Sequence, residues 1–129
     1  MAEREQLKCF GAYVKALDLF HQVVGDLSPL ADQPLLQRLI AQQFASADSV
    51  AANIEQGYGR GTQQECAQFL IVARGFAQET GGRYGRFSHW LPADVVAQRV
   101  ALCEEIVGIL TASIPTPGAK GTALPTRPV

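Results

Sequence analysis

The sequence predicts an all-α protein that folds as an up-down-up-down four-helix bundle. Apolar residues recur every three or four positions in four successive segments, which is the spacing of one helix face. No segment of useful length alternates apolar and polar residues as a strand does, and the sequence has no internal repeat. Short stretches containing proline or glycine join the segments, and short connections favour antiparallel neighbours.

Length and composition fit one domain with a substantial core. The chain has 129 residues, of which 47% are apolar and 18% are charged. This composition is too apolar for a chain that stays unfolded. We expect the bundle to span residues 1–114. Residues 115–129 contain four prolines and two glycines, so we expect them to form a flexible tail.

The first two helices are predicted on either side of a proline-containing turn. The first ends at Ser28-Pro29, and its apolar face consists of Phe10, Tyr13, Leu17, Phe20, Val24 and Leu27. The second begins at Pro34, because a proline in the first helical turn sacrifices no hydrogen bond. Its core face consists of Leu36, Ile40, Ala47, Val50, Ala51 and Ile54. Gly57 is expected to end it, since glycine adopts a left-handed terminal conformation without strain.

The third helix has a capping box at its start, in which Thr62 and Glu65 satisfy free backbone N–H groups. Its apolar face consists of Phe69, Leu70, Ala73, Phe76, Ala77 and Tyr84. Gly81-Gly82 is expected to kink or fray the helix near its end. The glycine-rich run at 57–61 has the composition of a phosphate loop. It follows a helix rather than a strand, however, so a tight helix–helix turn is favoured.

The fourth helix opens at Pro92 and has two adjacent apolar stripes. One consists of Val96, Val100, Cys103, Val107, Leu110 and Ile114, and the other of Val95, Leu102, Ile106 and Ile109. The helix is either deeply buried or contacts a partner subunit with its second stripe. We favour the partner, because a small bundle normally leaves part of each helix in water. Arg99 lies inside this apolar arc, where it either reaches solvent or pairs with a buried anion.

Two polar pairs invite a structural or a functional interpretation. Asn53 lies beside the apolar face, one turn after Ser49, and a small polar network there would fix the helix register. A ligand contact is the alternative. Glu79 and Arg83 are four residues apart in the order that stabilises a helix, which predicts an ion pair on the helix surface.

The sequence offers no catalytic or metal-binding arrangement. Cys9, Cys66 and Cys103 are widely spaced, which argues against a disulfide framework or a zinc site. His21 and His89 have no ligand-type residue at helical spacing. We therefore expect no enzyme activity, no cofactor and no metal. The charged start has no following signal segment, and no run is long enough to span a bilayer, so we expect a cytoplasmic protein that does not contact membranes.

Two linked segments carry a family resemblance. The run SVAANIEQGYGR at 49–60 and the segment from Glu65 through FLIVARG to Glu79 resemble the motifs SIxxNIAEGxGR and E…FLxIARGS…E of the four-helix-bundle family named after 23S rRNA intervening sequences. The matching signature residues are Asn53, Gly57, Gly59, Arg60, Glu65, Arg74 and Glu79. The chain departs from the motifs at Glu55-Gln56, Cys66 and Phe76, so a polar network built on the family's residues would differ here.

The resemblance implies an up-down bundle that assembles into a ring of five copies. Similar bundles accompany diversity-generating retroelements, where a basic surface is thought to engage nucleic acid. The expected function is therefore a non-enzymatic, homo-oligomeric interaction scaffold, and the expected oligomer is a pentamer. The second stripe of the fourth helix, Val95, Leu102, Ile106 and Ile109, supplies its candidate interface.

The alternative function is an RNA-binding accessory protein related to 23S rRNA intervening sequences or retroelements. Residues 1–114 hold nine basic and twelve acidic residues, a net charge of −3, which opposes binding to phosphates. The candidate RNA contacts are Arg38, Arg60, Arg83 and Arg86. We expect only weak, non-specific RNA binding that disappears by physiological salt. A protein partner other than a second copy of this chain is a further alternative.

Overall fold

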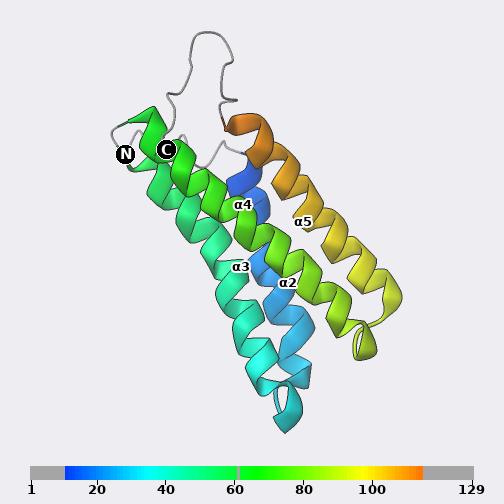
Figure 1. The fold of residues 1–129 in the computed structure, drawn as a ribbon. Coiled ribbons are helices and arrows are strands. Elements are labelled where there is room, and N and C mark those ends of the chain that lie inside the picture. Colours follow the sequence, from blue (N-terminus) through cyan, green and yellow to red (C-terminus); the bar gives the residue numbers. More distant parts are fainter. Residues whose placement is uncertain (1–10, 61, 115–129) are drawn as a thin grey trace.

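The computed structural model describes residues 11–60 and 62–114, and that part of the chain is all-α (Figure 1). Its long helices are α2 (Gly11–Leu27), α3 (Gln37–Tyr58), α4 (Gln63–Arg86) and α5 (Ala93–Ser113). Short 3-10 helices, η1 (Ser28–Leu30), η2 (Pro34–Leu36) and η3 (Phe87–His89), lie in the connections. Phe10, Cys9 and the expected tail at 115–129 lie outside the described residues.

The four long helices form an antiparallel bundle, which confirms the predicted fold class. Helix α2 packs against α3 and α5, and α4 packs against the same two helices (Figure 1). The short connections leave no room for a crossover, so consecutive helices run in opposite directions. The ends of α2 and α4 therefore lie with the starts of α3 and α5 at one end of the bundle.

The core confirms the predicted face of α3 and corrects that of α2. All six predicted core residues of α3 and η2 are buried. On α2, the buried residues are Ala12, Ala16, Leu19, Val23 and Leu27, whereas Leu17 is 39% exposed. The predicted face follows the largest apolar side chains of α2. Two of these, Tyr13 and Phe20, lie beside the core and not within it. Small alanines occupy the centre because they let neighbouring helices approach closely.

The two apolar stripes of α5 are explained by two neighbours within the same chain. Cys103 and Leu110 of the first stripe and Ile106 of the second are buried in the core. Ile109 lies on the α2 side, where its Cδ1 is 3.8 Å from a Cβ built on Gly11. Val100 and Val107 line the seam with α4. The expectation that Ile106 faces a partner subunit is wrong, because this side chain is fully buried in the bundle core.

The remaining interface candidates on α5 are Val95, Leu102 and Ile109. All three are half-buried in the single chain, so each keeps some surface that a second copy could cover. Because α2 and α4 pack against the two sides of the apolar arc of α5, the width of the arc does not by itself require a partner subunit.

Gly57 lies inside α3 and does not end it, which corrects the predicted left-handed terminus. The helix continues to Tyr58, and its C-terminal cap is Gly59, with a right-handed φ of −89°. A Cβ on Gly57 would stand 3.2 Å from both the Cys66 carbonyl oxygen and the Phe69 Cβ. Glycine is needed here because α4 passes so close, not because of the backbone conformation.

The predicted Thr62 cap of α4 is present, whereas the predicted fraying at its glycine pair is not. The Thr62 hydroxyl accepts a hydrogen bond of 3.1 Å from the Glu65 backbone N–H, which confirms the predicted cap. The expected fraying at Gly81-Gly82 is wrong, because α4 continues to Arg86. A Cβ on Gly81 would lie 3.1 Å from the Cys103 Cβ, so this glycine allows the close approach of α5.

Candidate functional site

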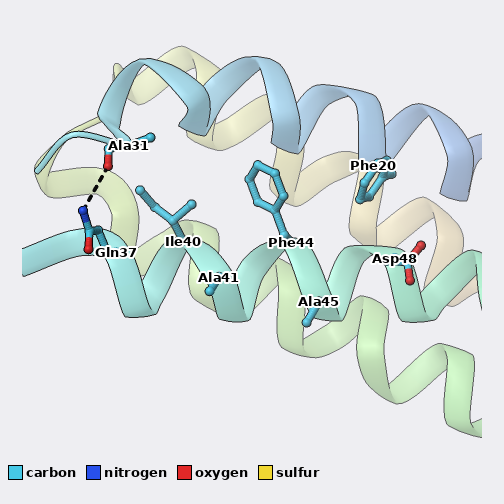
Figure 2. Close-up of a pocket in the computed structure, with 8 residues that line it drawn as sticks. All are labelled: Phe20, Ala31, Gln37, Ile40, Ala41, Phe44, Ala45 and Asp48. Atoms are coloured by element: carbon cyan, nitrogen blue, oxygen red, sulfur yellow. Dashed lines mark hydrogen bonds between the residues drawn. The ribbon is translucent and has the colours of Figure 1, made fainter. Parts of the chain in front are cut away.

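An open apolar groove lies on the outer surface between α2 and α3 (Figure 2). Phe20 of α2 faces Ile40 and Phe44 of α3 across a hollow of about 570 Å³. The Phe20 and Phe44 rings meet edge to face, with centroids 6.3 Å apart. The groove is closed toward η1 by the Gln37 side chain, whose Nε2 donates a long hydrogen bond of 3.5 Å to the Ala31 carbonyl.

The α3 side of this groove runs along a low ridge, which is formed by Arg38, Ala41, Ala45 and Asp48. Ala41 and Ala45 are exposed there, and Asp48 stands beside them in Figure 2. A second hollow, of about 260 Å³, lies on the α4 side of the same ridge and is also lined by Ala45 and by Ser49. Two hollows thus flank a strip of small side chains, and this surface can receive a bulkier element from another molecule.

A buried polar network joins α3 to α4 beneath the second hollow. The Arg83 Nη1 donates hydrogen bonds of 2.8 Å to Gln43 Oε1 and 3.0 Å to Ser46 Oγ. The Gln43 amide donates to the Thr80 carbonyl at 2.9 Å, and the Ser46 and Thr80 hydroxyls are 2.7 Å apart. Because only 8% of the Arg83 side chain is exposed, these bonds replace most of its hydration.

The outer side of this network is an ion pair. Arg83 Nη2 lies 2.8 Å from Glu79 Oε2, as the four-residue spacing predicted. The expectation of a surface pair is wrong for one partner, since Arg83 is buried and only Glu79 reaches solvent. Arg83 Nε is buried without a hydrogen-bond partner in the described part of the chain. Arg83 is therefore a structural cation, and its candidate role as an RNA contact is wrong.

A second polar cluster ties α2, α4 and α5 together near the same end of the bundle. Asp26 Oδ2 accepts hydrogen bonds of 2.7 Å from the Tyr84 hydroxyl and from Arg99 Nε, and Oδ1 accepts one of 3.0 Å from Arg99 Nη2. Of the two interpretations of Arg99, the buried pair is confirmed. Burial and the hydrogen bond to Asp26 raise the pKa of Tyr84, and the same carboxylate raises the pKa of Arg99.

The thiol of Cys103 lies under a third hollow, between α4 and α5, of about 350 Å³. Burial, and secondarily the Glu104 carboxylate, raises the pKa of this thiol from 9.0 to about 12. A thiol is nucleophilic only as the thiolate, so Cys103 is inert near neutral pH. Burial likewise raises the pKa of the Cys66 thiol beside Tyr58.

The raised pKa of Cys103 predicts a loss of stability in alkali. The folded state keeps the proton to about pH 12, whereas an exposed thiol loses it near pH 9.0. The contribution of this thiol to the free energy of unfolding is thus fully present below pH 9. It is lost as the pH rises toward 12, by up to about 1.4 kcal/mol per pH unit for one proton. Denaturant titrations across this range should show a shallower decline for Cys103→Ala, which keeps the Cβ packed against Gly81. Equal slopes for the two proteins would contradict this prediction.

Most of the family-signature residues make local contacts. Asn53 Nδ2 donates 2.8 Å to the Ser49 carbonyl of its own helix, so it does not build the expected network between helices. The guanidinium of Arg60 lies 4.9 Å from the centre of the Phe69 ring and donates to Gln56 Oε1 at 3.2 Å. Arg74 is different, because its Nη1 reaches across to the Thr111 hydroxyl of α5 at 3.2 Å.

The candidate RNA contacts do not form one surface. Arg38, in the first turn of α3, and Arg86, the last residue of α4, are exposed at the same end of the bundle. Arg60 lies 22 residues after Arg38, at the opposite end of α3, roughly 30 Å away along the helix. Exposed arginines are thus divided between the two ends.

Sequence reasoning missed the residues that do connect the helices. Gln43, Ser46 and Thr80 are buried polar residues on the predicted core faces of α3 and α4, and a polar residue on such a face was the available signal. The Asp26 partner of Arg99 had a weaker signal, since it stands in the last turn of α2, 73 residues away in sequence.

Within residues 11–60 and 62–114, no group of three or more His, Cys, Asp or Glu side chains could hold a metal ion. None of the described helices combines the length and the apolar character needed to cross a membrane. Protein-family models, curated proteins and solved structures give no match to the chain. The family resemblance thus stays a prediction from the two sequence segments.

Proposed function

We propose that this protein is a non-enzymatic helical bundle that acts as an interaction scaffold. The observation that carries the proposal is the open apolar groove between α2 and α3. A groove lined by Phe20, Phe44 and exposed alanines offers contact area to another macromolecule and few groups that could move a proton. Val14, 52% exposed on α2, and Leu35, 95% exposed just before α3, add apolar surface to the same pair of elements.

The polar clusters support the same proposal. Arg83 and Arg99 direct their guanidinium groups to partners inside the bundle, and Cys103 is protonated near neutral pH. These groups stabilise the contacts between helices, so the outer surface of the bundle is the part that can act on other molecules.

Self-association is the form of scaffolding that the resemblance implies. A ring of five copies stays a prediction, as does the cytoplasmic location. A ring needs head-to-tail contacts, to which Val95, Leu102 and Ile109 could contribute. Leu102→Glu should split such a ring, because a charge placed in an apolar interface costs several kcal/mol. Light scattering measures the number of copies directly.

Photo-crosslinking in cells tests the scaffold proposal. A photoreactive amino acid is placed at Ala45, on the ridge beside the groove, and at Ala101, an exposed alanine in the middle of α5, as the matched control. We expect protein adducts from position 45 well above those from position 101. Equal yields from both positions, or adducts to RNA alone, would overturn the proposal.

Weak RNA binding remains the second candidate, favoured only by the exposed pair of arginines at one end of the bundle. Filter binding from low to physiological salt measures it, because each phosphate contact steepens the salt dependence. We expect binding to vanish by physiological salt. Nanomolar affinity that persists there and falls when Arg38 and Arg86 are both replaced by alanine would place the RNA-accessory function first.

A further inference from the structure

The ridge of α3 has a self-complementary pattern of charge and size. Arg38, Ala41, Ala45 and Asp48 follow one another at spacings of three, four and three residues, so they share one face of the helix. All four are exposed. The cation stands at one end of the face, the anion at the other, and the two smallest side chains lie between them.

Neither charge forms an ion pair with another residue that the structure describes. Ten residues separate Arg38 from Asp48, a distance of roughly 15 Å along the helix, which is too far for an ion pair. Within the described residues, the ion pairs join other side chains: Lys15 with Glu105, Glu79 with Arg83, and Asp26 with Arg99. Both ridge charges are thus available to a partner.

A second copy of the same helix, laid antiparallel, matches this pattern at every position. If the two-fold axis passes at the level of residue 43, Arg38 of each copy falls opposite Asp48 of the other, and Ala41 falls opposite Ala45. A parallel arrangement would instead place like charges opposite each other, and their repulsion disfavours it. The charge order thus selects the antiparallel orientation.

The shape of the surface allows the same contact. Helix axes can approach to about 8 Å when the residues between them are small. The hollow beside Phe20 and Phe44 on one flank, and the hollow beside Ser49 on the other, leave room for the side chains of a second helix. Such a contact is isologous, since the same patch is used by both copies.

We propose that the ridge formed by Arg38, Ala41, Ala45 and Asp48 binds the same ridge of a second copy, with the two α3 helices antiparallel. This inference rests on the proposed scaffold function and names its first partner. It produces a pair of copies related by a two-fold axis, and this pair takes the place of the ring of five copies that the resemblance implies.

Sedimentation equilibrium on the full chain tests the proposal with a charge exchange. We expect a monomer–dimer equilibrium, and a dissociation constant at least tenfold higher for Arg38→Asp and for Asp48→Arg alone. The double variant should dimerise like the unchanged protein. An equimolar mixture of the two single variants should form heterodimers, because each substituted position then faces an opposite charge.

A pair of alanine substitutions separates this surface from the rest of the bundle. Ala45→Glu should abolish the dimer, and Ala101→Glu on α5 should leave it intact, with unchanged thermal melting for both because both positions are exposed. A monomer at all concentrations, a pentamer, or a failure of the double variant to recover would overturn the inference. Protein adducts from position 45 in cells, given by a monomeric protein, would retain the scaffold function and reject the second copy as its partner.

Discussion

Replacing Asp26 by alanine is expected to lower the free energy of unfolding by about 3–5 kcal/mol, the range for removing one partner of a buried ion pair. The Asp26 carboxylate accepts hydrogen bonds from both Tyr84 and Arg99. Only 11% of its side chain is exposed, and only 15% of that of Arg99. Without the carboxylate, the Tyr84 hydroxyl would stay buried with no acceptor, and the Arg99 guanidinium would keep only the 3.4 Å hydrogen bond from Nη1 to Gln98 Oε1.

Denaturant unfolding measures this loss, and Asp18→Ala is the matched control. Asp18 lies on the same helix but is exposed, and it accepts a single hydrogen bond from Gln22. Its removal should change stability by no more than about 0.5 kcal/mol. If the two alanine variants unfold at the same denaturant concentration, the cluster does not hold the three helices together.

The same cluster shows how far the sequence could predict the bundle. Helix positions, the Thr62 cap and the core face of α3 follow from spacing and local chemistry, because those signals act within one helix. Arg99 was recognised as anomalous within an apolar arc. Its partner could not be named, since the meeting of α2 with α5 depends on how the helices are offset along the bundle axis.

The register between α3 and α4 was similarly hidden in the sequence. Gly57 appeared to be a turn residue, whereas its role is to admit Cys66 and Phe69 of α4 to within contact distance. That close approach sets which turns of the two helices face each other, and so brings Gln43 level with Arg83. Asn53 was the polar residue expected in the network, but its side chain bonds to its own helix.

The groove between α2 and α3 could not be predicted from the sequence either, because it depends on the direction in which α2 turns its faces. Phe20 was expected in the core, and the structure places it half-buried at the edge. Tyr13, Leu17 and Phe20 lie at the edge or surface because the buried face of α2 runs through Ala12, Ala16, Leu19, Val23 and Leu27 instead. A pattern of apolar spacing defines the direction of a helix face only to within about one residue, and that uncertainty decides whether a phenyl ring is core or groove.

Replacing Gln43 by leucine is expected to lower the free energy of unfolding by about 3 kcal/mol. Leucine keeps most of the buried volume, so little packing is lost. It removes one of the two acceptors of Arg83 Nη1 and the donor to the Thr80 carbonyl. Arg83 keeps the Glu79 carboxylate and the Ser46 hydroxyl, but a buried polar group that loses one of its partners costs more than the net contribution of one hydrogen bond. Gln42→Leu, at the neighbouring exposed position, should change stability by no more than about 0.5 kcal/mol.

A double variant tells whether the cost of Gln43→Leu comes from the hydrogen bond that the buried guanidinium of Arg83 loses. Replacing Arg83 by methionine as well removes the buried charge and its unpartnered Nε, and retains most of the apolar stem. Replacing both partners by apolar groups of similar shape can be nearly neutral. We expect the double variant to unfold at a higher denaturant concentration than Gln43→Leu alone. Additive losses in this cycle would mean that Arg83 stabilises α4 through the packing of its stem, independently of Gln43.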